Sequence, residues 1–190
     1  GLVGFRRFIT RQSMSSVLDG IDSLGALKSL IACQGKDWPD TAILRAAGLR
    51  VIEIANFERM FQQLDLSKCD YFPRGYFEGF SELDVRKQKY PDLILYDSLV
   101  LHYPFALYFF VNKKNEDLAL WIEHGLEKMI DSGEFLRYMQ AHSLTRHVFP
   151  LSSTRGMRVI EIHNPRLPFD THVKDSRYWF QPEEVGYSAN

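Results

Sequence analysis

The stretch "IACQGKDWPDTAIL", residues 31–44, contains a short apolar run, a glycine, a polar elbow and the start of a helix. The apolar run predicts a buried strand, and Pro39 is typical of the first turn of a helix. A strand that ends shortly before a helix begins leaves backbone N–H groups available to an anionic or polar group. The elbow is therefore either part of a ligand site or an ordinary β-to-α turn.

The composition limits the class of protein. The chain has 190 residues, with 23 Lys and Arg against 24 Asp and Glu. This length fits one large domain or two small lobes, and the balanced charge gives no argument for a nucleic-acid partner. No apolar run is long enough to cross a membrane, and no signal peptide is recognisable, as is also true of an exported protein after processing.

Motifs for metals, cofactors and catalysis are missing from the sequence. The six histidines lack carboxylates or cysteines at ligand spacing, and no glycine-rich motif for a phosphate or dinucleotide is present. No nucleophile, base and orienting group are grouped together, so we expect neither a cofactor nor an enzyme. Cys33 and Cys69 do not have the spacing of a zinc or redox site, and form either one disulfide or two buried thiols, of which we favour the thiols.

Residues 4–98 alternate strand and helix patterns, with a helix cap at Asp22 or Ser23 and another at Asn56. This order predicts an α/β fold with a sheet of four or five mainly parallel strands. Further along, 92–115 resembles two apolar strands interrupted at Pro104, and a pair of helices breaks at Ser132. A last strand is expected within "RVIEIH", residues 158–163.

A second strand-to-helix junction lies in "DYFPRGYFEGF", residues 70–80, where Pro73 is expected to end a strand and Arg74 to follow it. Ligands of open α/β sheets bind outside the carboxyl ends of the strands. Arg74 is therefore either a ligand-binding residue at the same edge as the first elbow or a surface arginine that caps a carboxyl terminus or pairs with Glu78.

Residues 1–145 resemble the bacterial extracellular solute-binding proteins of family 3, which have the periplasmic binding-protein-like fold. The resemblance rests on "GLVGFRRFITR", "LGALKSLIACQGKDWPDTAILRAAGLRVIEI", "NFERMFQQLDLSKCDYFPRGYFE" and "YPFALYFFVNKKNEDLALWIEHGLEKMIDSGEFLRYM". It implies a lobe two at 1–100, a returning but incomplete part of lobe one with a tail at 101–190, and hinge segments near 1–8 and 96–104. The first half of lobe one has no counterpart here, so the chain is either a piece of a longer protein or a divergent one.

The resemblance also implies a function. A small solute would bind without catalysis between two lobes, in a periplasmic protein whose signal peptide has been removed and whose partner is an ABC transporter permease or a sensor protein. Family members carry an aspartate for the ligand's ammonium where this chain has Arg74, so we expect a solute with an anionic group instead. The alternative is a sensory or interaction domain that keeps the fold and contacts a partner protein.

The expected ligand-binding residues come from the two junctions. Arg74 would supply a bidentate guanidinium, Trp38 an apolar wall, and the backbone near Asp40 and Thr41 hydrogen-bond donors. The complete predicted set is Gln34, Gly35, Asp37, Trp38, Asp40, Thr41 and Arg74. The apolar stripe expected on helices within 116–145 should pack against residues 146–190 or against a second copy of the chain, which would make a homo-oligomer.

Overall fold

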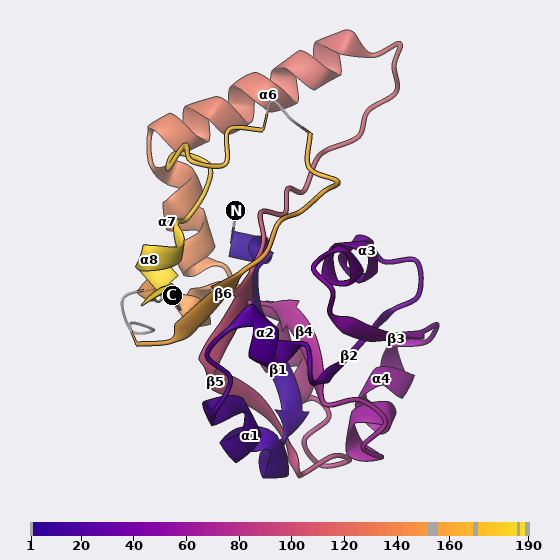
Figure 1. Ribbon diagram of the computed structural model, residues 1–190. Coiled ribbons are helices and arrows are strands. Elements are labelled where there is room, and N and C mark those ends of the chain that lie inside the picture. Colours follow the sequence, from indigo (N-terminus) through magenta and orange to yellow (C-terminus); the bar gives the residue numbers. More distant parts are fainter. Residues whose placement is uncertain (1, 152–155, 169–170, 186, 189–190) are drawn as a thin grey trace.

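The computed structural model describes residues 2–151, 156–168, 171–185 and 187–188. Its centre is a sheet with the strand order β3-β2-β4-β1-β5-β6-β7 (Figure 1). The strands are β1 (Phe5–Arg11), β2 (Ile31–Gly35), β3 (Arg50–Ile54), β4 (Tyr71–Gly75), β5 (Leu93–His102), β6 (Arg158–Glu161) and β7 (Tyr187–Ser188).

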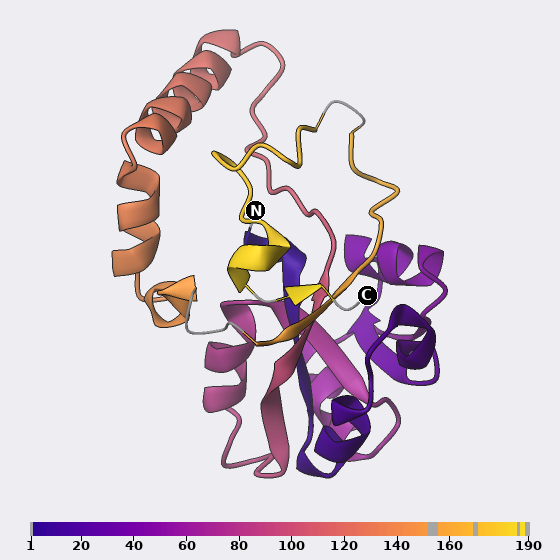
Figure 2. The same cartoon turned by 60° about the vertical axis from the view of Figure 1, so that its left-hand side comes forward.

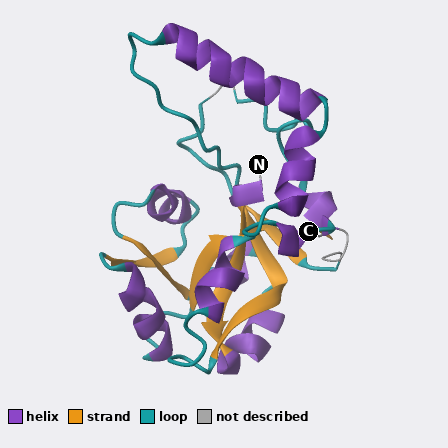
Figure 3. Ribbon diagram, turned by 180° about the vertical axis from the view of Figure 1, so that it is seen from behind, coloured by secondary structure: helices purple, strands orange, loops and turns teal. Residues whose placement is uncertain are grey.

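Helices cover both faces of the sheet (Figure 3). The helices are α1 (Ser15–Asp19), α2 (Leu24–Leu27), α3 (Pro39–Ala46), α4 (Phe57–Asp65), α5 (Glu78–Asp84), α6 (Glu116–Asp131), α7 (Glu134–Ala141) and α8 (Pro182–Val185), with 3-10 turns at Leu2–Gly4, Gln12–Met14 and Arg146–Val148. Side chains of α1, α2 and α3 pack with Phe8 of β1, whereas α4 packs with its neighbour Ile9. Successive strand residues point to opposite faces of the sheet, so β1 contributes to the apolar cluster on each face.

The predicted α/β class with a mainly parallel sheet is confirmed. Among the described strands, four pairings are parallel (β2–β3, β2–β4, β5–β6 and β6–β7) and two are antiparallel (β1–β4 and β1–β5). The antiparallel strand is the first one, which the sequence pattern had placed in a simple β-α rhythm. Because β1 lies between β4 and β5 and runs against both, its first residues lie at the edge where those two strands end.

Local signals in the sequence have mixed outcomes. Ser23 and Asn56 cap α2 and α4, as expected, by accepting hydrogen bonds from backbone N–H groups three residues later. Pro73 does not end a strand, because β4 continues through it to Gly75. The segment 104–111 forms no strand, and its Phe110 side chain is 93% exposed.

The two cysteines form a disulfide, which corrects the prediction of two thiols. Cys33 lies within β2 and Cys69 just before β4, and their Cα atoms are 5.6 Å apart. The strands are neighbours, with Ala32 opposite Tyr71. Their distance along the chain hid this proximity, which arises from a parallel pairing of β2 with β4 after α3, β3 and α4.

The helices α6 and α7 stand away from the sheet as an arc (Figure 2). The later chain packs against part of them: the Tyr178 hydroxyl donates to Glu127 Oε1 at 2.6 Å, and Arg177 lies 3.7 Å from Asp131. Other side chains of the predicted apolar stripe stay in solvent, Trp121 with 79% of its surface. Packing against a second copy remains a prediction. No helix within the described residues has the length and apolar character that a membrane crossing requires.

The disulfide closes a loop with a sequence separation of 36 residues. Loop-closure entropy predicts that reduction lowers the free energy of unfolding by about 4 kcal/mol. Urea denaturation with and without a phosphine reductant measures this difference. Equal free energies of unfolding in the two conditions would contradict the prediction.

His102 ends β5 with its ring stacked on Phe5 at 4.3 Å, and its Nδ1 lies 3.7 Å from Glu161 Oε2, beyond hydrogen-bond distance. Burial lowers the pKa of the imidazole below its ordinary value of 6.5, and attraction to Glu161 and Glu183 offsets this only in part. The unfolded chain therefore binds the proton more readily than the folded one. The contribution of His102 to the free energy of unfolding is fully present above pH 6.5 and decreases as the pH falls below that value.

Replacing His102 with glutamine should reduce the loss of stability between pH 6.5 and 5. One proton corresponds to a slope of at most about 1.4 kcal/mol per pH unit. Urea denaturation of both proteins across this range provides the measurement. Identical slopes for wild type and His102→Gln would show that another group carries the pH dependence.

Candidate functional site

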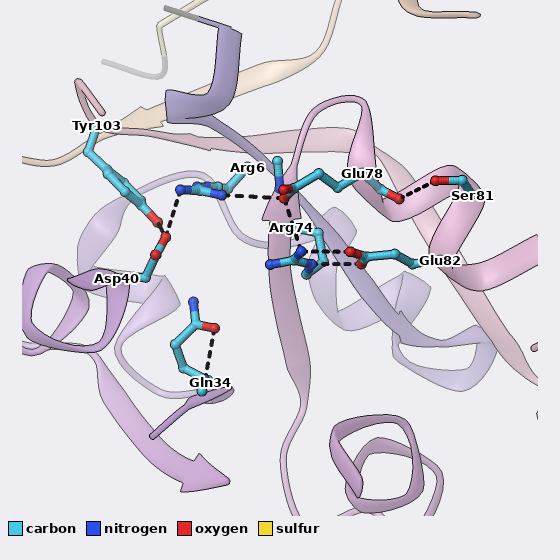
Figure 4. Close-up of polar contacts among 10 residues, drawn as sticks. Arg6, Gln34, Asp40, Arg74, Glu78, Ser81, Glu82 and Tyr103 are labelled. Atoms are coloured by element: carbon cyan, nitrogen blue, oxygen red, sulfur yellow. Dashed lines mark hydrogen bonds and ion pairs between the residues drawn. The ribbon is translucent and has the colours of Figure 1, made fainter. Parts of the chain in front are cut away.

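The candidate site lies at the edge of the sheet where β2, β4 and β5 end. Gly35, Gly75 and His102 are the last residues of these strands, and Arg6 lies near the start of the antiparallel β1 at the same edge. Charged side chains of β1 and β4 and of the helices α3 and α5 meet there (Figure 4). Carboxyl ends of neighbouring parallel strands are where α/β sheets place ligands.

The elbow between β2 and α3 is shaped by Gly35. A Cβ atom at Gly35 would lie 2.2 Å from the Trp38 indole, so only glycine lets this ring pack over the strand end. The Thr41 hydroxyl donates to the Gly35 carbonyl at 2.9 Å and fixes the start of α3. Asp37 has a φ of 64° and is exposed at the tip of the turn.

Asp40, in the first turn of α3, is a buried carboxylate with two partners. Arg6 Nη2 lies 2.8 Å from its Oδ1, and the Tyr103 hydroxyl donates to the same oxygen. The Arg6 guanidinium also lies over the Phe105 ring at 4.9 Å. Burial raises the pKa of the Tyr103 phenol well above its ordinary value, so this hydroxyl keeps its proton and serves as a donor.

Arg74 is buried, with 9% of its surface exposed, and is bound to carboxylates of α5. Its Nε and Nη2 donate to the two carboxylate oxygens of Glu82 at 2.7 and 2.6 Å. Burial by itself lowers the pKa of this guanidinium, but the hydrogen bond to Glu82 and the charges of Glu78, Glu82 and Asp40 raise it overall. The Trp38 ring lies 5.2 Å from the guanidinium carbon. Arg74 is therefore charged and held in one orientation.

Glu78 connects the two arginines. Its Oε2 lies 3.1 Å from Arg74 Nη2 and 3.7 Å from Arg6 Nη1, and it accepts a hydrogen bond from the Gly75 N–H at 2.9 Å. One chain of charged groups thus runs from Asp40 through Arg6, Glu78 and Arg74 to Glu82 (Figure 4). We call these five side chains the rim cluster.

Three polar atoms at this edge are buried without a hydrogen-bond partner among the described residues: Gln34 Nε2, Arg6 Nε and His102 Nδ1. Gln34 is completely buried, and within the described part of the chain its Oε1 accepts a hydrogen bond only from the neighbouring Gly35 N–H, at 3.1 Å. In Figure 4 the amide of Gln34 points to the side on which Asp40 and Arg74 lie. Burying such a donor without a partner is unfavourable, which marks it as a place for a further acceptor.

The structure brings most of the predicted residues to one edge. Those at or beside the rim cluster are Gln34, Gly35, Trp38, Asp40, Thr41 and Arg74. Asp37 points into solvent, and the Thr41 N–H donates to the Trp38 carbonyl at 3.1 Å, which removes one of the backbone donors expected for a ligand. Trp38 packs on Phe57 and Arg74, and its role as a ligand wall stays a prediction.

Sequence reasoning missed Arg6, Glu82 and Tyr103. A signal for Arg6 was present in "FRRF", where two charged residues interrupt an apolar strand. The pairing of Arg74 with Glu78, one of the alternatives considered for this arginine, does occur, but in a buried cluster rather than on the surface.

Two pockets lie away from the rim cluster. One of about 300 Å³ is lined by residues of α4 together with Lys89 and Tyr90. The other, of about 340 Å³, lies between the junction of α6 with α7 and residues 176–180. Within the described residues, no group of His, Cys, Asp and Glu could hold a metal ion.

Comparisons with known proteins give matches among solved structures. One is an ancestral arginine-binding protein bound to glutamine, with 18% identity over 72% of this chain and 58% of that chain and a TM-score of 0.48. Another is substrate binding domain 2 of Lactococcus lactis GlnP in its open conformation, with 18% identity over 72% and 57% of the two chains and a TM-score of 0.42.

A third is a histidine kinase sensor domain described as similar to periplasmic binding proteins, with 15% identity over 70% and 56% of the two chains and a TM-score of 0.44. The chain spans less than two thirds of each of these three proteins. No protein-family model and no curated protein matches it.

Removing the Arg74 side chain should destabilise the fold. Arg74→Ala leaves the partly buried Glu82 without its counter-ion and Glu78 with Arg6 alone at 3.7 Å, and breaking such a pair costs roughly 3–5 kcal/mol. Arg45→Ala is the matched control, because Arg45 pairs with Glu53 while about half exposed and should lose no more than about 1 kcal/mol. Urea denaturation measures both, and a loss for Arg74→Ala as small as the control's would contradict the buried pairing.

Proposed function

We propose that this chain is the ligand-contacting part of a non-catalytic solute-binding protein, with a small polar solute at the rim cluster. The observation that carries the proposal is the buried Gln34 Nε2, which has no hydrogen-bond partner among the described residues and lies beside two buried arginines. A solute that brings an acceptor to this edge would satisfy the free donor, and a second lobe that closes over it would exclude water.

The charges suggest the chemistry of the solute. Arg74 Nη1 makes no hydrogen bond with any described residue, so Arg74 can bind an anionic group of the solute, and Gln34 can donate to a further acceptor of that solute. Two arginines face three carboxylates in the rim cluster, an excess of one negative charge. A solute with only negative charge would be repelled by this excess. We therefore propose a solute that carries an anionic group and a positive group together.

The disulfide supports an exported protein, because disulfides form and persist in oxidising compartments such as the bacterial periplasm. In this proposal the lobe comprises residues 1–100, residues 101–190 belong to a second lobe, and the hinge segments lie near 1–8 and 96–104. The partner is an ABC transporter permease or a sensor protein. The two hinge segments are in contact with each other, since Phe5 of β1 pairs with His102 of β5.

A second candidate, a sensory or interaction domain that contacts a partner protein, is favoured by one separate observation. Phe110 and Trp121 are 93% and 79% exposed, close to the start of α6 and within it. Native mass spectrometry of the protein purified from its host distinguishes the two. A retained small molecule supports solute binding, and a protein partner without a small molecule supports the interaction domain.

Replacing Gln34 with leucine should separate binding from stability. The variant removes an unsatisfied buried amide, so its melting temperature should be unchanged or higher. Affinity for the co-purified solute should fall about ten- to hundredfold, the effect of one hydrogen bond to a charged group. Calorimetric titration measures it, with Gln62→Leu on the exposed face of α4 as the control. Unchanged affinity in Gln34→Leu would remove the rim cluster from the binding site.

A further inference from the structure

Three donors converge on a single oxygen of Glu78. They are Arg74 Nη2 at 3.1 Å, the Gly75 N–H at 2.9 Å and, further away, Arg6 Nη1 at 3.7 Å. Two guanidinium groups and a backbone N–H aimed at one point make a position for a carboxylate oxygen. In the structure that oxygen belongs to the chain itself.

Glu78 is held less firmly than the other carboxylates of the rim cluster. Its side chain is 30% exposed, against 18% for Glu82 and 9% for Asp40. Glu82 binds Arg74 through both of its oxygens, whereas every contact of the Glu78 carboxylate described here uses Oε2 alone. Its exposed side also gives the Glu78 side chain a route into solvent, away from the two arginines.

The remaining groups keep the arginines paired when Glu78 leaves. Arg6 retains Asp40 at 2.8 Å, and Arg74 retains Glu82. Arg6 Nε and Gln34 Nε2 are donors buried at the same edge, and neither has a hydrogen-bond partner among the residues that the structure describes. Both residues are at least nine-tenths buried, with exposures of 3% and 0%. Glu78 binds neither of these donors, so both stay available to other polar groups of an incoming solute.

We propose that Glu78 is an internal competitor: its carboxylate occupies the anion position of the free protein, and the anionic group of a solute binds by displacing it. The solute itself rests on the proposed function, whereas the anion position rests on the geometry around Glu78. A tethered carboxylate competes at high effective concentration, so wild-type protein binds simple carboxylates weakly. Glu78 thus selects solutes whose other contacts make up for its displacement.

Formate is the probe, since it is a carboxylate with no other recognition group. Thermal unfolding is followed in rising formate at constant ionic strength balanced with chloride, and the shift gives an apparent affinity. Glu78→Ala should bind formate at least tenfold more tightly than wild type. Glu58→Ala is the matched control, because it removes a carboxylate paired with Arg86 at 2.8 Å outside the rim cluster, and should show no gain.

Glu78→Gln covers the case in which Glu78→Ala does not fold. The amide keeps the size of the side chain and an acceptor for the Gly75 N–H but removes the charge, so a gain of at least threefold is expected. The proposal is overturned when formate binds no better to either variant than to wild type, or when Glu58→Ala gains as much. Formate binding can be measured without the solute of the host. If Glu78→Ala gains affinity for formate and no small molecule co-purifies, the anion position is supported and the proposed function is contradicted.

Discussion

Two guanidinium groups are buried at one edge of the sheet, and the need to neutralise them governs how the surrounding elements are placed. A buried charge without a partner costs several kcal/mol, so Arg6 and Arg74 can stay inside only if carboxylates meet them there. Asp40 comes from the first turn of α3, and Glu78 and Glu82 from α5. Each of these helices follows directly on a strand of the same edge, so their positions are fixed by charge as well as by apolar packing.

The direction of β1 makes this arrangement available. Because β1 is antiparallel to β4 and β5, its second residue lies beside their last residues rather than at the far end of the sheet. Aromatic rings then enclose the arginines, Tyr103 and Phe105 around Arg6 and Trp38 around Arg74. This shielding excludes water, which strengthens the ion pairs and at the same time makes the loss of any one member costly.

Much of this fold was predictable from local signals, and much of the rim cluster was not. Asn56 and Ser23 act through neighbouring backbone, so their capping could be inferred from a few residues. The direction of β1 and the Cys33–Cys69 bond depend on strand pairing over long stretches of chain, which local patterns do not encode. Gln34 and Arg74 could be predicted because each lies close to the end of a strand that leads into a helix. Arg6 belongs to a strand that begins at this edge instead of ending there, so that pattern could not find it.

The pairing of Phe5 with His102 also has a practical consequence. The chain enters and leaves the segment 4–105 at neighbouring positions, since the Tyr103 N–H donates to the Gly4 carbonyl at 3.1 Å. This segment keeps both aromatic rings that enclose Arg6, and it suits insertion into a surface loop of a host protein, such as a fluorescent one. The host loop would need little stretching to accept both ends. Such a graft also needs a replacement for β6 along the outer side of β5, because an unpaired strand edge promotes aggregation. The rim cluster would then lie next to both junctions, so a solute that bound as proposed would act close to the host reporter.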